Sequence, residues 1–233
     1  MQIREVDAGR GLGWISEGFS MFLKDWGMWI VVFLLYGAMM LVCSMVPLLG
    51  ALASPLLASL LAGGLMQACR EQEGGGELKV DVLFRGFSEH TRQLLMIGVV
   101  TMLASAAIGV IAVIALGGSI VSLQTDDFGS ALPFSSLLGA ALVSLAVLAV
   151  AVPLAMATWF APALVMLAGQ EALEAMKLSF QACLRNMLPF LVYAVILLVL
   201  FFVATIPLGL GLLVLGPTII ASIYVSYRDL FGA

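Results

Sequence analysis

Long apolar runs separated by short polar segments dominate the pattern of the chain. A helix that crosses a bilayer needs about 20 apolar residues, and charge within it is costly. Six runs that contain no Lys, Arg, His, Asp or Glu cover residues 27–46, 48–68, 94–116, 134–156, 188–206 and 208–227. The pattern therefore predicts an all-α membrane protein with six transmembrane helices.

A short amphipathic segment precedes the first, third and fifth runs. Its apolar residues recur at helical spacing opposite charged ones, as with Val80, Leu83 and Phe87 against Asp81 and Arg85. Such segments favour short helices in the cytoplasmic interface, with a basic residue at headgroup height. The residues expected to anchor them are Trp14, Phe19, Lys24, Phe87, Arg92, Phe180 and Arg185.

One motif closes all three amphipathic segments. Residues 19–25, 87–93 and 180–186 each read phenylalanine, four residues, a basic residue and a polar residue. Because each unit then contains two spans, successive units enter the membrane in the same direction. We predict a single transmembrane domain over residues 1–233, built from three parallel repeats of interfacial helix plus hairpin at 12–71, 79–168 and 170–230. The simpler alternative is a chain of hairpins that each need an anchoring lead-in.

Composition and charge place the chain and orient it. Hydrophobic residues make up 63% and charged residues 10%, whereas a soluble domain is roughly a quarter charged, so a soluble protein is excluded. All ten Lys and Arg lie before residue 27, within 70–92 and 177–185, or at position 228; the turns near Pro47 and Pro207 and the loop 117–133 have none. Connecting segments rich in Lys and Arg stay on the cytoplasmic side of a membrane. We therefore expect both termini in the cytoplasm and the loop with Asp126 and Asp127 on the outer side of the membrane.

Pro55, Pro153 and Pro217 lie within the second, fourth and sixth predicted spans. Pro55 and Pro217 occupy matching places in the first and last units. Proline can break a membrane helix where the freed backbone groups line a cavity. The three positions are therefore predicted helix breaks and possible cavity residues, with a simple packing kink as the alternative.

Residues that could carry catalysis are few. His90 is the only histidine, and beside Glu89 it has neither a nucleophile nor a metal partner. Cys43, Cys69 and Cys183 lack metal or redox spacing. The net charge of −4 argues against nucleic acid, and spans without ionisable groups argue against ion-coupled transport. We expect no catalytic residue, no cofactor and no metal.

Several stretches resemble a known but uncharacterised family. They are residues 1–6 (MQIREV), 13–14 (GW), 159–165 (WFAPALV), and the series from Ser179-Phe180 through Arg185-Asn186 to Pro189-Phe190. Over nearly the whole chain they resemble a proteobacterial family of small integral membrane proteins. In architecture, though not in motif, the chain is similar to YciC-like inner-membrane proteins. The resemblance implies six helices in the inner membrane and assigns no functional residue.

The lack of reactive groups favours binding over catalysis. We expect a non-enzymatic scaffold or accessory protein that engages membrane lipids, another membrane protein or a second copy of itself. The alternative is a facilitator or export permease for small uncharged or amphipathic molecules, with a cavity near Pro55 and Pro217. An enzyme of lipid metabolism would need a conserved charged pair on the cytoplasmic face; an alignment in which Glu89, His90 and Arg92 are invariant would support it.

Overall fold

The computed structural model describes residues 2–46, 49–125 and 134–232, which are helical almost throughout. They form nine α-helices and one 3-10 helix, which confirms the all-α prediction. In chain order these are α1 (Arg10–Lys24), α2 (Trp26–Ser44), α3 (Leu49–Glu73), η1 (Val80–Phe87), α4 (Thr91–Thr125), α5 (Phe134–Trp159), α6 (Ala161–Ala168), α7 (Ala172–Arg185), α8 (Met187–Thr205) and α9 (Leu212–Phe231).

Five stretches of the described residues are long and apolar enough to cross a membrane, and they match the first five predicted spans. They are Trp26–Ser44, Leu52–Glu73, Thr91–Val113, Ala141–Ala168 and Met187–Thr205. The sixth prediction is wrong in its bounds, because α9 begins four residues later than expected and ends at Phe231. Among the described residues no candidate span is found at α9, and the last turn of this helix holds the charged residues Arg228 and Asp229.

The predicted loop between the third and fourth spans also starts too early. The sequence places it at 117–133, but α4 continues to Thr125. Asp126 and Asp127, together with Pro47, lie outside the described residues. The sequence analysis ended the helix at Gly117-Gly118, but residues 117–125 contain no proline and no charge, and the helix continues through both glycines.

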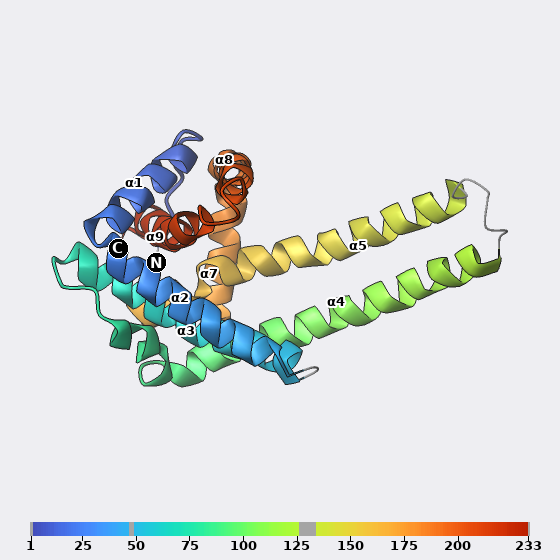
Figure 1. The fold of residues 1–233 in the computed structure, drawn as a ribbon, viewed down its shortest axis with the longest axis horizontal. Helices are drawn as coiled ribbons and strands as arrows, with labels where there is room; N and C mark the ends of the chain where they lie inside the picture. The colour runs from blue at the N-terminus through green and yellow to red at the C-terminus, as the bar shows by residue number, and fades with distance from the viewer. Residues whose placement is uncertain (1, 47–48, 126–133, 233) are drawn as a thin grey trace.

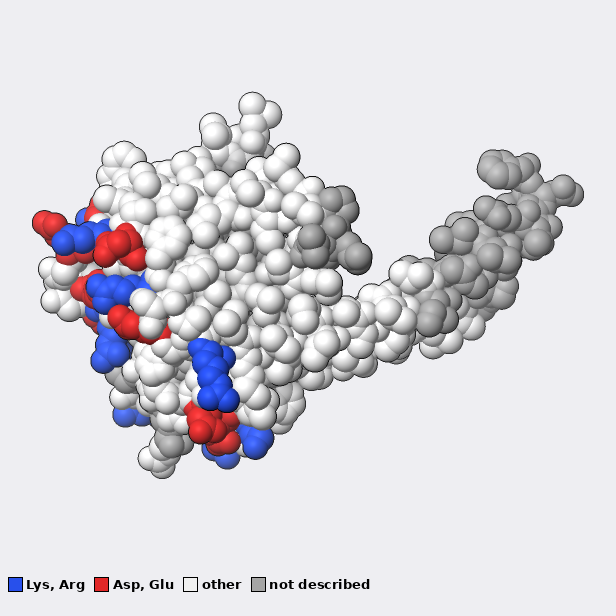
Figure 2. Space-filling view, turned by 90° about the horizontal axis from the view of Figure 1, so that it is seen from below, with Lys and Arg blue, Asp and Glu red and all other residues white. Residues whose placement is uncertain are grey.

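Most helices gather in one body, from which the paired helices α4 and α5 project (Figure 1). Both chain ends lie in that body (Figure 1), where the backbone N–H of Arg4 donates to the carbonyl of Leu230 at 2.8 Å. Figure 2 shows the charged side chains gathered over the end of the molecule away from the projecting pair. An apolar projection and a charged opposite end are the arrangement that a bilayer and its aqueous boundary favour.

All three amphipathic segments are helical, but the second is a 3-10 helix. Their buried faces include only some of their large apolar residues. In α7, for example, Ala175, Ser179 and Ala182 are buried, whereas Leu173 and Leu184 are exposed. Small residues permit close helix contact in a lipid environment, where large aliphatic side chains gain little from facing protein. Helical periodicity alone therefore did not identify which face packs.

An aromatic cluster joins the first helix to the later ones. The ring of Trp14 lies 5.2 Å from that of Phe190 and 6.0 Å from that of Tyr193, measured between centroids. Phe160 packs edge-on against Phe190 and Phe231. These spacings suit favourable aromatic packing. The N-terminal helix is thereby held against α8 and α9, the last elements of the chain.

Candidate functional site

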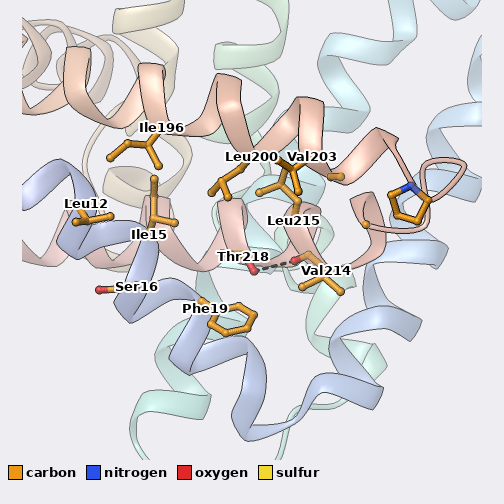
Figure 3. A pocket seen from close by; sticks show the side chains of 13 residues that line it. Leu12, Ile15, Ser16, Phe19, Ile196, Leu200, Val203, Val214, Leu215 and Thr218 are labelled. Carbon is orange, nitrogen blue, oxygen red and sulfur yellow. Dashed lines mark hydrogen bonds between the residues drawn. The ribbon is translucent and has the colours of Figure 1, made fainter.

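An apolar groove of about 560 Å³ runs between α1, α8 and α9. Figure 3 shows Leu12, Ile15 and Phe19 of α1 facing Leu200 and Val203 of α8 across this space. The hydroxyl of Thr218 donates to the carbonyl of Val214 at 2.7 Å, as Figure 3 also shows. The wall therefore offers almost only carbon, and its size is that of a small-molecule site.

The tight α8–α9 turn closes one end of this groove. Gly211 lies so close to Ala204 that an added Cβ would stand 2.6 Å from the Ala204 Cα atom. Gly209 has a positive φ of 81°, a conformation open to glycine at low cost. The two helices can therefore approach at the turn while diverging enough further along to leave the groove.

A second apolar groove of about 540 Å³ lies between α5, α7 and α8. Its lining includes Met156, Trp159, Cys183, Met187, Tyr193 and Ala194. The indole Nε1 of Trp159 is buried and donates no hydrogen bond within the described part of the chain. Beside the groove, the Ser179 hydroxyl donates to the Met156 carbonyl at 2.6 Å and accepts from the Phe160 N–H at 2.9 Å.

A network of charged side chains ties α1, α3 and α9 together at the charged end. Asp229 accepts hydrogen bonds from Arg10 Nε at 2.8 Å and from Trp14 Nε1 at 2.9 Å, and it also pairs with Arg10 Nη2. Arg228 pairs with Glu73 and, at 2.9 Å, with Glu17. Arg10 also pairs with Glu17 at 2.9 Å. The hydrogen bond to Asp229 raises the pKa of Arg10, so its charge persists.

The seven predicted anchors differ in burial, and their anchoring role stays a prediction. Trp14 is fully buried: its N–H donates to Asp229 and its ring packs in the aromatic cluster. Phe180 is half-buried. Phe19, Lys24, Phe87, Arg92 and Arg185 are exposed, as an anchor requires.

The prolines do not break their helices. Pro55, Pro153 and Pro217 lie inside α3, α5 and α9, and none of them lines the two apolar grooves. Hydroxyls next to two of them bond to the helix backbone, as Ser54 does to the Gly50 carbonyl at 2.6 Å. Such bonds, with helix–helix packing, let a membrane helix continue through proline. The three helices therefore continue through their prolines, and a role of these residues at a cavity stays a prediction.

The charged group considered for catalysis is not assembled. Glu89 pairs with Arg85 at 3.2 Å. No hydrogen bond or ion pair joins Glu89 to His90 or Arg92 in the described ranges. Residues 2–46, 49–125 and 134–232 hold no group of three His, Cys, Asp or Glu arranged for a metal ion.

Sequence reasoning missed the charged network and both grooves. One feature of the sequence could have indicated the network: Arg228 and Asp229 lie at the end of an apolar helix, where charges need partners. The grooves have none, because their lining residues are ordinary apolar residues of three separated helices. Only the packing of those helices brings the walls together.

Comparison with known proteins adds one relative. No family model matches the chain, and no solved structure matches it. The probable inner membrane protein BTH_II0599 of Burkholderia thailandensis is 30% identical over 258 aligned positions, which cover 100% of this chain and 94% of the relative. That name and the five candidate spans support a multi-pass protein of the inner membrane. This chain belongs to the family of that inner membrane protein.

Proposed function

We propose that this chain is a non-catalytic scaffold or accessory protein of the inner membrane that binds membrane lipid or a partner membrane protein. The two apolar grooves carry the proposal. Each is an open groove whose wall is almost entirely carbon, and each lies between helices that expose large aliphatic side chains. A lipid chain or an apolar helix fits such a wall, whereas a polar substrate would find few partners there.

We also infer that the three units are parallel repeats closed into a ring. The short helix of each unit packs on the second long helix of the preceding unit: η1 on α3, α7 on α5, and α1 on α9. The last of these joins the beginning of the chain to its end. A rigid ring of this kind suits a scaffold, because each unit holds its neighbour in place.

A small residue directly before the repeated phenylalanine supports the ring at each crossing. Gly18 lies against Ser222 of α9, and Gly86 lies against Leu60 of α3. Ser179 takes the same place in α7 and bonds to Met156 of α5. The same residue position thus contacts the preceding unit closely in all three units, as repeats would require.

The polar residue that ends the motif supports the same inference in two units. Gln93 Oε1 accepts from the N–H of Ala172, at the start of α7, at 2.9 Å. Asn186 Oδ1 accepts from the N–H of Val6, ahead of α1, at 3.0 Å. Each side chain therefore fastens the lead-in of the next unit in the ring. In the first unit Asp25 instead accepts from the N–H of Met28 and caps α2.

The proposed orientation puts both termini in the cytoplasm. In a background without Cys43, Cys69 and Cys183, we expect Asp126→Cys to react with an impermeant maleimide added to spheroplasts. Lys79→Cys should react only after the membrane is opened, because positive segments stay inside. Lysed cells supply the control for reactivity at both sites. Labelling of Lys79→Cys alone on intact spheroplasts would reverse the proposed orientation.

The binding proposal is tested by native mass spectrometry from mild detergent. We expect the purified protein to retain phospholipid or a second membrane protein. A variant that fills both grooves with exposed tryptophans, Ala194→Trp with Val203→Trp, should retain markedly less while keeping its helical circular dichroism. Recovery of only the bare monomer from the unsubstituted protein would refute the proposed function.

The permease alternative rested on broken helices at Pro55 and Pro217. Because α3 and α9 continue through these prolines, no observation favours it over binding. We propose no catalytic step.

A further inference from the structure

The two apolar grooves differ in the charges next to them. At the α1–α8–α9 groove, the neighbouring charges Arg10 and Glu17 pair with each other and with residues of α9. At the α5–α7–α8 groove, the neighbouring charge is Arg185, which lies between the lining residues Cys183 and Met187. Arg185 is exposed and makes no ion pair with any residue that the structure describes. Only the second groove thus has, within two residues of its lining in the chain, an arginine without an ion pair among the described residues.

The second groove also holds an unused hydrogen-bond donor. The Trp159 ring forms part of its wall, and the indole N–H has no acceptor among the described residues. An unsatisfied buried donor is unfavourable, more so where lipid replaces water. The ring itself lines the groove, and its buried N–H would face an occupant only after the side chain rotates.

A glycerophospholipid offers a partner to both the guanidinium of Arg185 and the indole N–H of Trp159. Its phosphate is an anion that a guanidinium binds with two parallel hydrogen bonds. Its ester carbonyls accept hydrogen bonds just below the headgroup, and its acyl chains match a wall of carbon. The surrounding bilayer delivers it at high concentration to a groove that opens among exposed apolar helices.

We propose that the α5–α7–α8 groove binds one glycerophospholipid, with an acyl chain along the groove, the phosphate on Arg185 and an ester carbonyl on the Trp159 N–H. The inference rests on the proposed lipid-binding function and names its ligand and its site. The α1–α8–α9 groove has apolar walls alone, so it holds apolar chains without selecting a headgroup.

The test is native mass spectrometry of the full chain with two added lipids that have the same acyl chains. One is dioleoyl phosphatidylglycerol and the other is dioleoylglycerol, which lacks the phosphate. The unsubstituted protein should bind the phospholipid about tenfold more tightly. Arg185→Gln should remove most of that preference, and Trp159→Phe should weaken both lipids about threefold to tenfold, as loss of one hydrogen bond predicts.

Matched variants on the same helices serve as controls. Lys177→Gln also removes a positive charge from α7, but Lys177 already pairs with Glu174 at 3.7 Å; it should keep the preference. Ala194→Trp fills the proposed site and should abolish phospholipid selection, whereas Val203→Trp, on the other groove, should not.

The outcomes separate this inference from the broader function. If the unsubstituted protein binds neither lipid and carries no partner, the proposed function fails. If it binds lipid but Arg185→Gln and Ala194→Trp leave the phosphate preference unchanged, the function stands and the site assigned here is wrong.

Discussion

Gly86→Val is expected to destabilise the protein by about 3 kcal/mol, at the upper end of the cost of overpacking. An added Cβ at Gly86 would overlap the carbonyl oxygen of Leu60 and stand 2.9 Å from its carbonyl carbon. These are backbone atoms of α3, which cannot turn aside as a side chain could. The 3-10 helix η1 would therefore have to leave α3, and one crossing of the proposed ring would open. Unfolding followed by circular dichroism in detergent measures the loss.

Two further variants identify the contact as the cause. Gly109→Val places the same side chain on α4, where nothing lies within 4 Å of the new Cβ, so stability should change little. Gly18→Val meets the backbone N of Ser222 at 2.7 Å, so it should destabilise much as Gly86→Val does. Equal unfolding curves for Gly86→Val and Gly109→Val would refute the close crossing of η1 and α3.

The sequence was most informative about which segments are helices in lipid. A helix in hydrocarbon must be apolar and must satisfy its own backbone hydrogen bonds. The apolar runs alone therefore located five spans, and most of the predicted ends lie within a few residues of the observed ends. Composition did not predict the end of α9, because ion pairs with residues of α1 and α3 allow this helix to include Arg228 and Asp229. Those partners are more than 150 positions away in the chain.

Which side of each short helix packs was not readable from periodicity. On α1 the sequence places Trp14 and Phe19 in one apolar stripe, yet Trp14 is fully buried and Phe19 is 41% exposed. In water an apolar stripe must be buried, but beside lipid it can stay outside while glycines make the contact. The better signal was the small residue before each repeated phenylalanine, at Gly18, Gly86 and Ser179.

The candidate site depends still more on tertiary packing. Arg185 was predicted as an interfacial anchor from the motif, and it is exposed. The sequence does not show that Arg185 is close in the chain to residues that line a groove, or that the N–H of Trp159 in the groove wall is unpaired. Both follow only from the packing of α5, α7 and α8. The prolines were predicted to mark cavities because proline removes a backbone hydrogen bond, yet each of the three helices continues through its proline.

Asp229→Ala is expected to destabilise the protein by about 2 kcal/mol. The change removes the acceptor of the Trp14 N–H, and Trp14 is fully buried, so that donor would be left without a partner. Arg10 would lose a partner as well, but it keeps Glu17 and is partly exposed, so its share is screened and small. Because Asp229 links α9 to α1, the loss should appear in unfolding of the whole chain.

A double-mutant cycle isolates the indole bond from the ion pair. In a Trp14→Phe background, which lacks the donor, Asp229→Ala should cost less by roughly 1 kcal/mol, and that difference measures the coupling. Lys177→Ala breaks a pair in which the lysine side chain is 71% exposed, so it should change stability by less than about 0.5 kcal/mol. If Asp229→Ala proves as harmless as Lys177→Ala, the first and last helices are held together by packing alone, and the charged network does not stabilise the ring. A full effect that persists in the Trp14→Phe background would instead assign the stabilisation to Arg10.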